Sequence, residues 1–119
     1  MYQYRAIVTK IYDGDTMTLD IDLGFGVWLK KQSIRMARIA AAEIRGEERP
    51  QGLIVRDTLR GWLPLGTVVL LETQKDKAGK YGRWLGEVYF MGNMMDAQSA
   101  EAGISYNQRL LNEGLVELY

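Results

Sequence analysis

Residues 13–23 read Asp-Gly-Asp-Thr-Met-Thr-Leu-Asp-Ile-Asp-Leu, the most regular pattern in the chain. From Thr16 onward, apolar side chains alternate strictly with polar ones, which is typical of a strand with one buried face. Asp and Gly are common turn residues, and Gly14 allows a sharp turn at little steric cost. We therefore predict a turn that leads into a half-buried strand over residues 16–23.

The same turn has a second interpretation. Asp13 and Asp15 are two carboxylates separated by one glycine, and Thr16 adds a hydroxyl group. Carboxylate oxygens are hard ligands suited to Ca²⁺ or Mg²⁺. The turn is thus either a plain connection between strands or part of a metal site.

Composition limits the possible functions. The chain has 119 residues, 47% of them hydrophobic, which suits one domain over residues 1–119 with a real core. It contains no cysteine and no histidine, so zinc sites built on those residues, thiol nucleophiles and the Ser-His-Asp triad are excluded. Acid–base chemistry must fall to Asp, Glu, Lys or Tyr. The formal net charge is zero, so any anion site must be local.

Neither a secretory signal nor a membrane-spanning segment is visible in the sequence. Residues 1–10 lack a continuous apolar core, and no apolar run is long enough to cross a bilayer. We expect no membrane partner, a monomer, and a cytoplasmic location rather than secretion.

The remaining elements follow from periodicity and turn residues. Strands are predicted over residues 2–12, 16–23, 27–39, 67–73 and 83–90, and helices over residues 51–62 and 105–113. The fold class is mainly β with helices: a five-stranded closed barrel of the OB-fold type, carrying two or three short helices. A sandwich would require more strands.

The first helix is expected to bury a stripe at a spacing of four residues, namely Ile54, Thr58 and Trp62, with Val55 and Leu59 beside it. Its solvated side is expected to carry Arg56, Asp57 and Arg60.

Four charged positions stand out as candidates for chemistry: Asp15, Arg35, Glu43 and Arg83. Arg35 lies between two apolar residues of a strand, and a buried charge is costly without a partner. Each has an ordinary alternative. Arg35 could lie on a half-solvated face, Glu43 could be a solvated loop acid, and Arg83 could be a charge at the barrel rim.

Taken together and in order, these positions resemble the staphylococcal nuclease-like (thermonuclease) domain family from Tyr4 to about Leu118. The pieces that carry the resemblance are Asp13-Gly14-Asp15-Thr16, Ile34-Arg35-Met36-Ala37-Arg38-Ile39 with Glu43, Lys80-Tyr81-Gly82-Arg83, and the helix at residues 107–115 ending in Gly-Leu.

The resemblance implies a Ca²⁺-dependent phosphodiesterase that hydrolyses single-stranded DNA or RNA. It implies a metal site at Asp15 and Ala41, with backbone carbonyls and waters completing the oxygen ligands. By the same resemblance Glu43 orients or deprotonates the attacking water, and Arg35 and Arg83 bind the phosphate. Lys80 and Tyr81 would contact a nucleotide phosphate.

The chemistry of these residues agrees with that assignment. Hydrolysis of a phosphodiester increases negative charge on the phosphoryl oxygens, and a divalent ion and two guanidinium groups would neutralise it. Arginine suits this role because its planar fork makes two parallel hydrogen bonds to phosphate.

One departure bears on activity. The family usually reads Ile-Asp-x-Pro-Glu after the third strand, whereas this chain reads Ile39-Ala40-Ala41-Ala42-Glu43. A carboxylate ligand is therefore absent at Ala40, and a proline is absent at Ala42. The site could be a slower nuclease, have a different metal preference, or bind without cutting. The alternative is a catalytically inactive OB-fold module that binds nucleic acid or protein, and an unrelated small barrel would follow if Arg35 and Arg83 were far apart.

Overall fold

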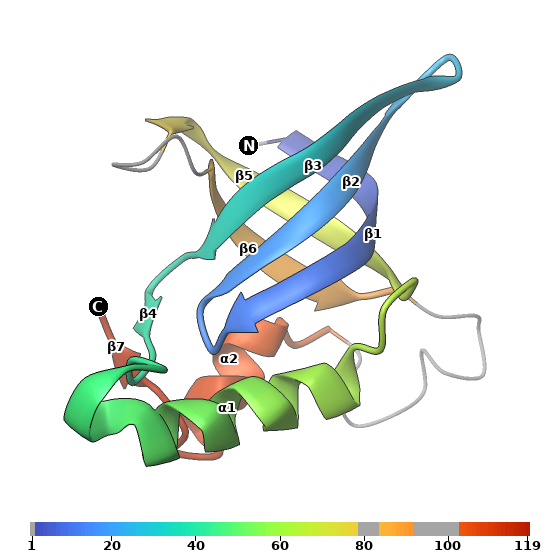
Figure 1. Ribbon diagram of the computed structural model, residues 1–119. Coiled ribbons are helices and arrows are strands. Elements are labelled where there is room, and N and C mark those ends of the chain that lie inside the picture. The colour runs from blue at the N-terminus through green and yellow to red at the C-terminus, as the bar shows by residue number, and fades with distance from the viewer. Residues whose placement is uncertain (1, 79–83, 92–102) are drawn as a thin grey trace.

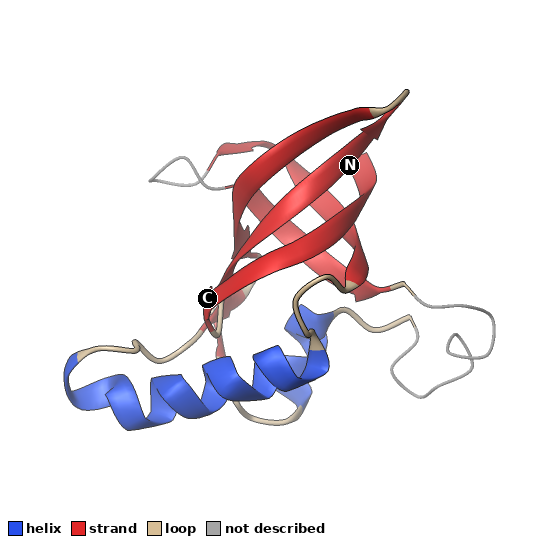
Figure 2. Cartoon of the chain, turned by 45° about the vertical axis from the view of Figure 1, so that its right-hand side comes forward, coloured by secondary structure: helices blue, strands red, loops and turns tan. Residues whose placement is uncertain are grey.

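The computed structural model describes residues 2–78, 84–91 and 103–119. Five strands close into a barrel in the order β1-β2-β3-β6-β5: β1 (Tyr2–Asp13), β2 (Thr16–Gly24), β3 (Val27–Met36), β6 (Trp84–Phe90) and β5 (Val68–Ala78). Helices α1 (Arg49–Trp62) and α2 (Tyr106–Asn112) lie together at one end of the barrel, and the β2–β3 hairpin projects from the other (Figures 1 and 2). The predicted closed five-stranded barrel with short helices is confirmed.

In strand β2, alternate side chains face the core of the barrel. Met17, Leu19 and Ile21 are buried and Thr18, Asp20 and Asp22 are partly exposed, as predicted. The alternation fails at the two ends of the predicted strand, where Thr16 is buried and Leu23 is 44% exposed. The β2–β3 turn was also predicted correctly at residues 24–26. Phe25 and Gly26 both have positive φ, and Gly24 pairs with Val27. A two-residue loop with two positive φ angles matches the twist of the flanking strands.

The third strand is shorter than predicted. The sequence suggested one strand over residues 27–39, but β3 ends at Met36, and a separate short strand, β4 (Ile39–Ala40), follows. Between them Arg38 has a φ of 69°, and the Ala37 N–H donates to the Gly86 carbonyl at 2.8 Å. The chain therefore leaves the barrel there, and β4 pairs with β7 (Glu117–Leu118).

Strand β5 is longer than predicted. We expected a strand over residues 67–73 followed by a polar loop, but β5 continues to Ala78. Strand β6 pairs with β5 from Val69↔Phe90 to Thr73↔Gly86, and after a register shift Ala78 pairs with Trp84. The longer strand thus ends at a residue with a long-range partner, which local composition does not reveal. The predicted fifth strand began at Arg83, which lies outside the described residues.

Helix α1 buries only part of the predicted face. Val55 and Leu59 are buried together with Gly52, and Trp62 is partly buried against the core, whereas Ile54 is 54% exposed. Arg60 is exposed, as expected, and its guanidinium also donates to the Ile11 carbonyl at 2.8 and 3.2 Å. The helix follows the 3₁₀ turn η1 (Gly46–Glu48), and Pro50 is in its first turn.

The predicted second helix is confirmed. The Ser105 side chain accepts from the Gln108 N–H at 3.0 Å and so caps the start of α2. At the other end Gly114 has a φ of 69°, and the Leu115 N–H donates to the Leu110 carbonyl at 3.0 Å. This left-handed glycine ends the helix as expected.

Asn107 fastens α2 to the barrel. It is fully buried, and its Nδ2 donates to the Ala37 carbonyl at 2.9 Å and to the Gly86 carbonyl at 3.1 Å. Its Oδ1 accepts from the Val88 N–H at 3.0 Å. One side chain thus connects the helix to β6 and to the point where the chain leaves β3.

Candidate functional site

The turn between β1 and β2 forms the centre of the candidate site. Asp13, Asp15 and Thr16 are all buried, although each is polar. The Asp15 N–H donates to Asp13 Oδ1 at 3.1 Å, which holds the turn. A Cβ on Gly14 would lie 2.4 Å from Val55 Cγ1 and 2.7 Å from Ala41 Cβ. Glycine is therefore required here for α1 and the 41–45 loop to pack against the turn.

Asp15 joins three parts of the chain. Its Oδ1 accepts from the Thr16 hydroxyl at 3.1 Å, and its Oδ2 accepts from the Ala41 N–H at 2.9 Å. Arg35 Nη2 lies 3.5 Å from the same Oδ2. Because β2 pairs with β3 as Thr16↔Arg35, the guanidinium emerges beside the turn. These contacts bring together Asp15, Arg35 and Ala41, all of them predicted site residues.

Arg35 is held in place from two further directions. Its Nη1 donates to the Met36 carbonyl at 2.8 Å. Its guanidinium lies over the Tyr119 ring, 5.2 Å from the centroid. Its side chain is only 15% exposed. Arg35 therefore lies on the outward face of β3, between the buried residues Ile34 and Met36, but its charge has an acidic partner and an aromatic contact.

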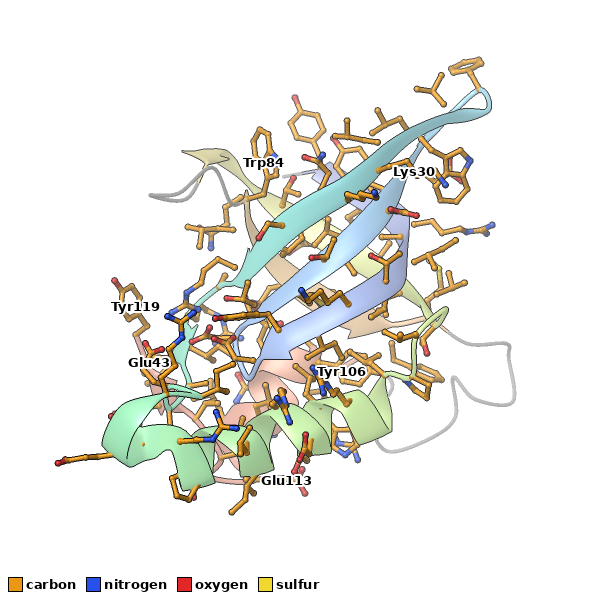
Figure 3. All side chains as sticks on the ribbon, in the orientation of Figure 1. Lys30, Glu43, Trp84, Tyr106, Glu113 and Tyr119 are labelled. Carbon is orange, nitrogen blue, oxygen red and sulfur yellow. The ribbon has the colours of Figure 1, made fainter. Side chains whose placement is uncertain are left out.

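Negative charge is concentrated at the turn. The pKa of Asp13 is raised from 3.8 to about 6, first because the carboxyl is buried, then because of the Asp15 charge, with a smaller contribution from Glu43. Glu43 lies on the exposed loop after β4, where its N–H donates to Glu48 Oε1 at 2.9 Å. In Figure 3 the Glu43 and Tyr119 side chains lie at the same end of the molecule.

Three predicted residues lie outside the described residues: Arg83, Lys80 and Tyr81. The nearest described residue, Trp84, begins β6 and pairs with Ile34, the neighbour of Arg35. Whether Arg83 reaches the phosphate stays a prediction.

Two residues at the site were not among the predicted site residues. Asp13 is in the quoted motif, but its spacing alone gave no reason to place it beside Asp15. Tyr119 follows β7, and no local signal in the sequence indicates that the last residues reach Arg35. Asp13 is placed by a local hydrogen bond from the Asp15 N–H, whereas the placement of Tyr119 depends on the long-range pairing of β4 with β7.

The donor chemistry of the turn fits a hard divalent cation. Two adjacent buried carboxylates, with a third acid close enough to raise the pKa of Asp13, offer anionic oxygens that repel one another unless a cation is present. Ala40, where the family has an aspartate, pairs across the short sheet with Glu117, so the two side chains share a face. Within the described ranges, no group of three acidic side chains is placed to hold a metal ion. Water and backbone carbonyls would therefore have to complete a coordination shell.

Comparisons with known proteins add no assignment. A scan against the models of known protein families finds no match for this chain, and a search of curated proteins finds none either. Among the residues that the structure describes, no helix is long and apolar enough to cross a membrane. The functional reading therefore depends on the geometry of the barrel end at which Asp15, Arg35 and the 41–45 loop meet.

Proposed function

We propose that this chain is a divalent-metal-dependent phosphodiesterase of the staphylococcal nuclease-like type, acting on single-stranded DNA or RNA. The observation that carries the proposal is the convergence on one carboxylate. Asp15 Oδ2 accepts from the Ala41 N–H at 2.9 Å and lies 3.5 Å from Arg35 Nη2. Residues far apart in the sequence thus form one charged site, which is the arrangement that phosphodiester hydrolysis requires.

The barrel supports the finer part of the proposal, an OB-fold. Strand order β1-β2-β3-β6-β5, with α1 inserted between β3 and β5, gives five barrel strands and a helix after the third. Strands β3 and β6 pair in parallel, and the other barrel pairs are antiparallel. This connectivity fits a five-stranded Greek-key barrel.

Each residue has a distinct task in the proposed reaction. Arg35 binds the scissile phosphate through N–H groups not used by the Met36 carbonyl, and Asp15 keeps its guanidinium oriented. Glu43 accepts a proton from the attacking water, whose oxygen bonds to phosphorus as the bond to the leaving oxygen breaks. A divalent ion held by Asp15, Asp13 and the backbone near Ala41 would supply charge neutralisation at the phosphoryl oxygens.

The test is cleavage of labelled single-stranded DNA with Ca²⁺, with and without chelator. We expect chelator-sensitive cleavage that is strongly reduced in Asp15→Asn and increased in Ala40→Asp, which restores the missing carboxylate. Asp57→Asn is the matched control, because Asp57 is exposed on α1 and pairs only with its neighbour Arg56 in the described structure. Absence of chelator-sensitive cleavage in both the wild type and Ala40→Asp would overturn the proposal.

The second candidate is an inactive OB-fold module that binds nucleic acid or protein. The observation in its favour is Ala40, which leaves the described residues without three acidic side chains around one point. Binding of single-stranded DNA that is unaffected by Ca²⁺, with no cleavage in either chain after long incubation, would support this candidate.

A further inference from the structure

A polar groove lies on the outer face of strands β1, β2 and β3. It has a volume of about 660 Å³ and is lined by Thr9, Lys10, Thr18, Asp20, Lys30 and Lys31. Lys30 lies toward the β2–β3 hairpin, whereas Glu43 lies at the helical end of the molecule (Figure 3). The groove is therefore separate from the candidate site around Asp15.

A β-bulge brings two consecutive lysines to this groove. The β2–β3 register passes from Leu19↔Gln32 to Ile21↔Leu29, which leaves Lys30 and Lys31 together opposite Asp20. Successive residues of a regular strand point to opposite faces, and a bulge changes where a side chain points. Both lysines can line one groove for this reason.

The backbone at Lys31 is strained. Its φ is 55°, in the left-handed region that costs a residue with a Cβ roughly 1 kcal/mol and costs glycine almost nothing. The Lys31 N–H donates to Asp20 Oδ1 at 2.9 Å, which holds the bulge. A charged residue where glycine would be more stable is typical of strain located at a functional surface.

The groove also carries excess positive charge in a chain whose net charge is zero. Lys30 Nζ lies 3.5 Å from Asp20 Oδ2. Lys10 and Lys31 make no side-chain ion pair with the described residues. Three lysines against one carboxylate leave two charges for an anionic ligand.

The outer face of the β2–β3 ladder leads from the candidate site to the groove. Thr16 pairs with Arg35 and Thr18 with Ser33, and the next outward residue of β2 is Asp20 in the groove. Asp20 lies four residues after Thr16 along the strand, a distance of roughly 13 Å. A ligand bound at Arg35 and running along this face reaches the lysines within a few nucleotides.

We propose that this groove binds the phosphodiester backbone of a single-stranded nucleic acid, a few nucleotides away from the phosphate held at Arg35. The choice of ligand rests on the proposed nuclease function, and the charge and shape of the groove are independent of it. Trp28 lies next to a lining residue of the groove, because its ring centroid is 5.4 Å from Lys30 Nζ, and the residue is 37% exposed. An exposed indole beside a basic groove provides a surface on which a base stacks.

The first test measures binding without cleavage. Fluorescence anisotropy of a labelled single-stranded DNA of about 15 nucleotides, in chelator, gives affinity as a function of salt. Replacing Lys10, Lys30 and Lys31 with Gln should lower the slope of log affinity against log salt by about 2, at about 0.7 per phosphate contact. At about 0.1 M salt, affinity should fall on the order of 10- to 100-fold.

Single variants test whether weaker DNA binding by the triple variant comes from a folding defect rather than from the lost charges. Lys10→Gln leaves the Lys31–Asp20 bond intact and should still weaken binding, whereas Arg56→Gln removes the same charge from α1 and should not. Lys31→Gly should weaken binding while raising the free energy of unfolding, since it relieves the left-handed strain. An unchanged salt slope in the triple variant would overturn the inference. So would binding of the wild type to anionic lipid vesicles but not to DNA.

A second test separates this inference from the proposed function. A small chromogenic phosphodiester of thymidine reaches only the site at Arg35, so the triple lysine variant should cleave it at the wild-type rate. Its KM for long single-stranded DNA should rise, on the order of 10-fold or more. If DNA binds through the lysines but no substrate is ever cleaved, the nuclease proposal fails and the groove stands. If both substrates are cleaved as by the wild type, the groove fails and the nuclease proposal stands.

Discussion

Replacing Asp13 by asparagine should stabilise the protein at neutral pH and leave it unchanged in acid. Asp13 is only 8% exposed, and its burial together with the neighbouring Asp15 charge raises the pKa of its carboxyl from 3.8 to about 6. Asn keeps an oxygen that can accept the Asp15 N–H, the bond that holds the turn. The change therefore removes the charge with little change in shape.

The sign follows from linkage. The pKa of Asp13 is higher in the folded protein than in the unfolded chain, so the folded state binds more protons between about pH 4 and pH 6. The stability contributed by the protonated carboxyl is fully present below its unfolded pKa and is lost as pH rises through its folded pKa. The difference between 3.8 and about 6 corresponds to roughly 3 kcal/mol.

Urea unfolding of both proteins across this pH range measures the effect. At about pH 7 Asp13→Asn should be more stable than the wild type by up to roughly 3 kcal/mol, and by about pH 4 the curves should nearly meet. Asp57→Asn, at an exposed position, should show no comparable trend. Bound Ca²⁺ should shrink the advantage at neutral pH, because a cation stabilises the ionised carboxylate. Equal differences in stability at both pH values would refute the reasoning.

Three further changes test the packing around the site. Gly52→Ala would place a Cβ 2.1 Å from a backbone carbonyl oxygen and should lower the free energy of unfolding by roughly 1–3 kcal/mol or more, as measured by urea unfolding. Gly61→Ala is the control within the same helix. Its Cβ would have open space, so this variant should raise the free energy of unfolding by about 0.5–1 kcal/mol. Asn107→Ala removes three buried hydrogen bonds and should cost about 3 kcal/mol in the same assay. Tyr119→Leu removes the ring under Arg35 and should lower the free energy of unfolding by about 0.5–1 kcal/mol. Tyr119→Phe keeps the ring and should retain most of that stability. Equal losses in both variants would exclude a stabilising contact between the ring and Arg35.

Local patterns were enough to predict much of the barrel. The alternation in β2 requires one buried face, and Gly24-Phe25-Gly26 provides the positive φ angles that a tight hairpin needs. The end of β3 and the length of β5 could not be predicted in the same way. Arg38 adopts a left-handed conformation without being glycine, and β5 runs beyond the predicted Thr73 to Ala78, which pairs with Trp84 after a register shift. Both features depend on partners far away in the sequence.

Residues of the candidate site could be predicted only where the type of residue requires a particular environment or partner. An arginine within an apolar strand required a partner, and Arg35 has one in Asp15. Residue type alone did not indicate that Asp13 or Tyr119 belongs to the site. Asp13 belongs to it because its side chain is buried there, and Tyr119 because the pairing of β4 with β7 brings the last residues to Arg35. The bulge at Lys31 could not be predicted from the sequence, because it arises from a register shift against β2 and no turn residue marks its position.

Tertiary packing fixes the loop in which Ala42 stands where the nuclease-like family usually has a proline. Ala41 is held by the bond from its N–H to Asp15 and by its contact with the turn at Gly14. The carbonyls of Ala42 and Glu43 lie against Gly52, so close that any side chain there would have to displace them. The loop is therefore fixed between the β1–β2 turn and α1 by tertiary packing. It follows that the position of the proposed general base is set by two glycines outside the loop, and that a change in α1 would move this base without touching any charged residue of the site.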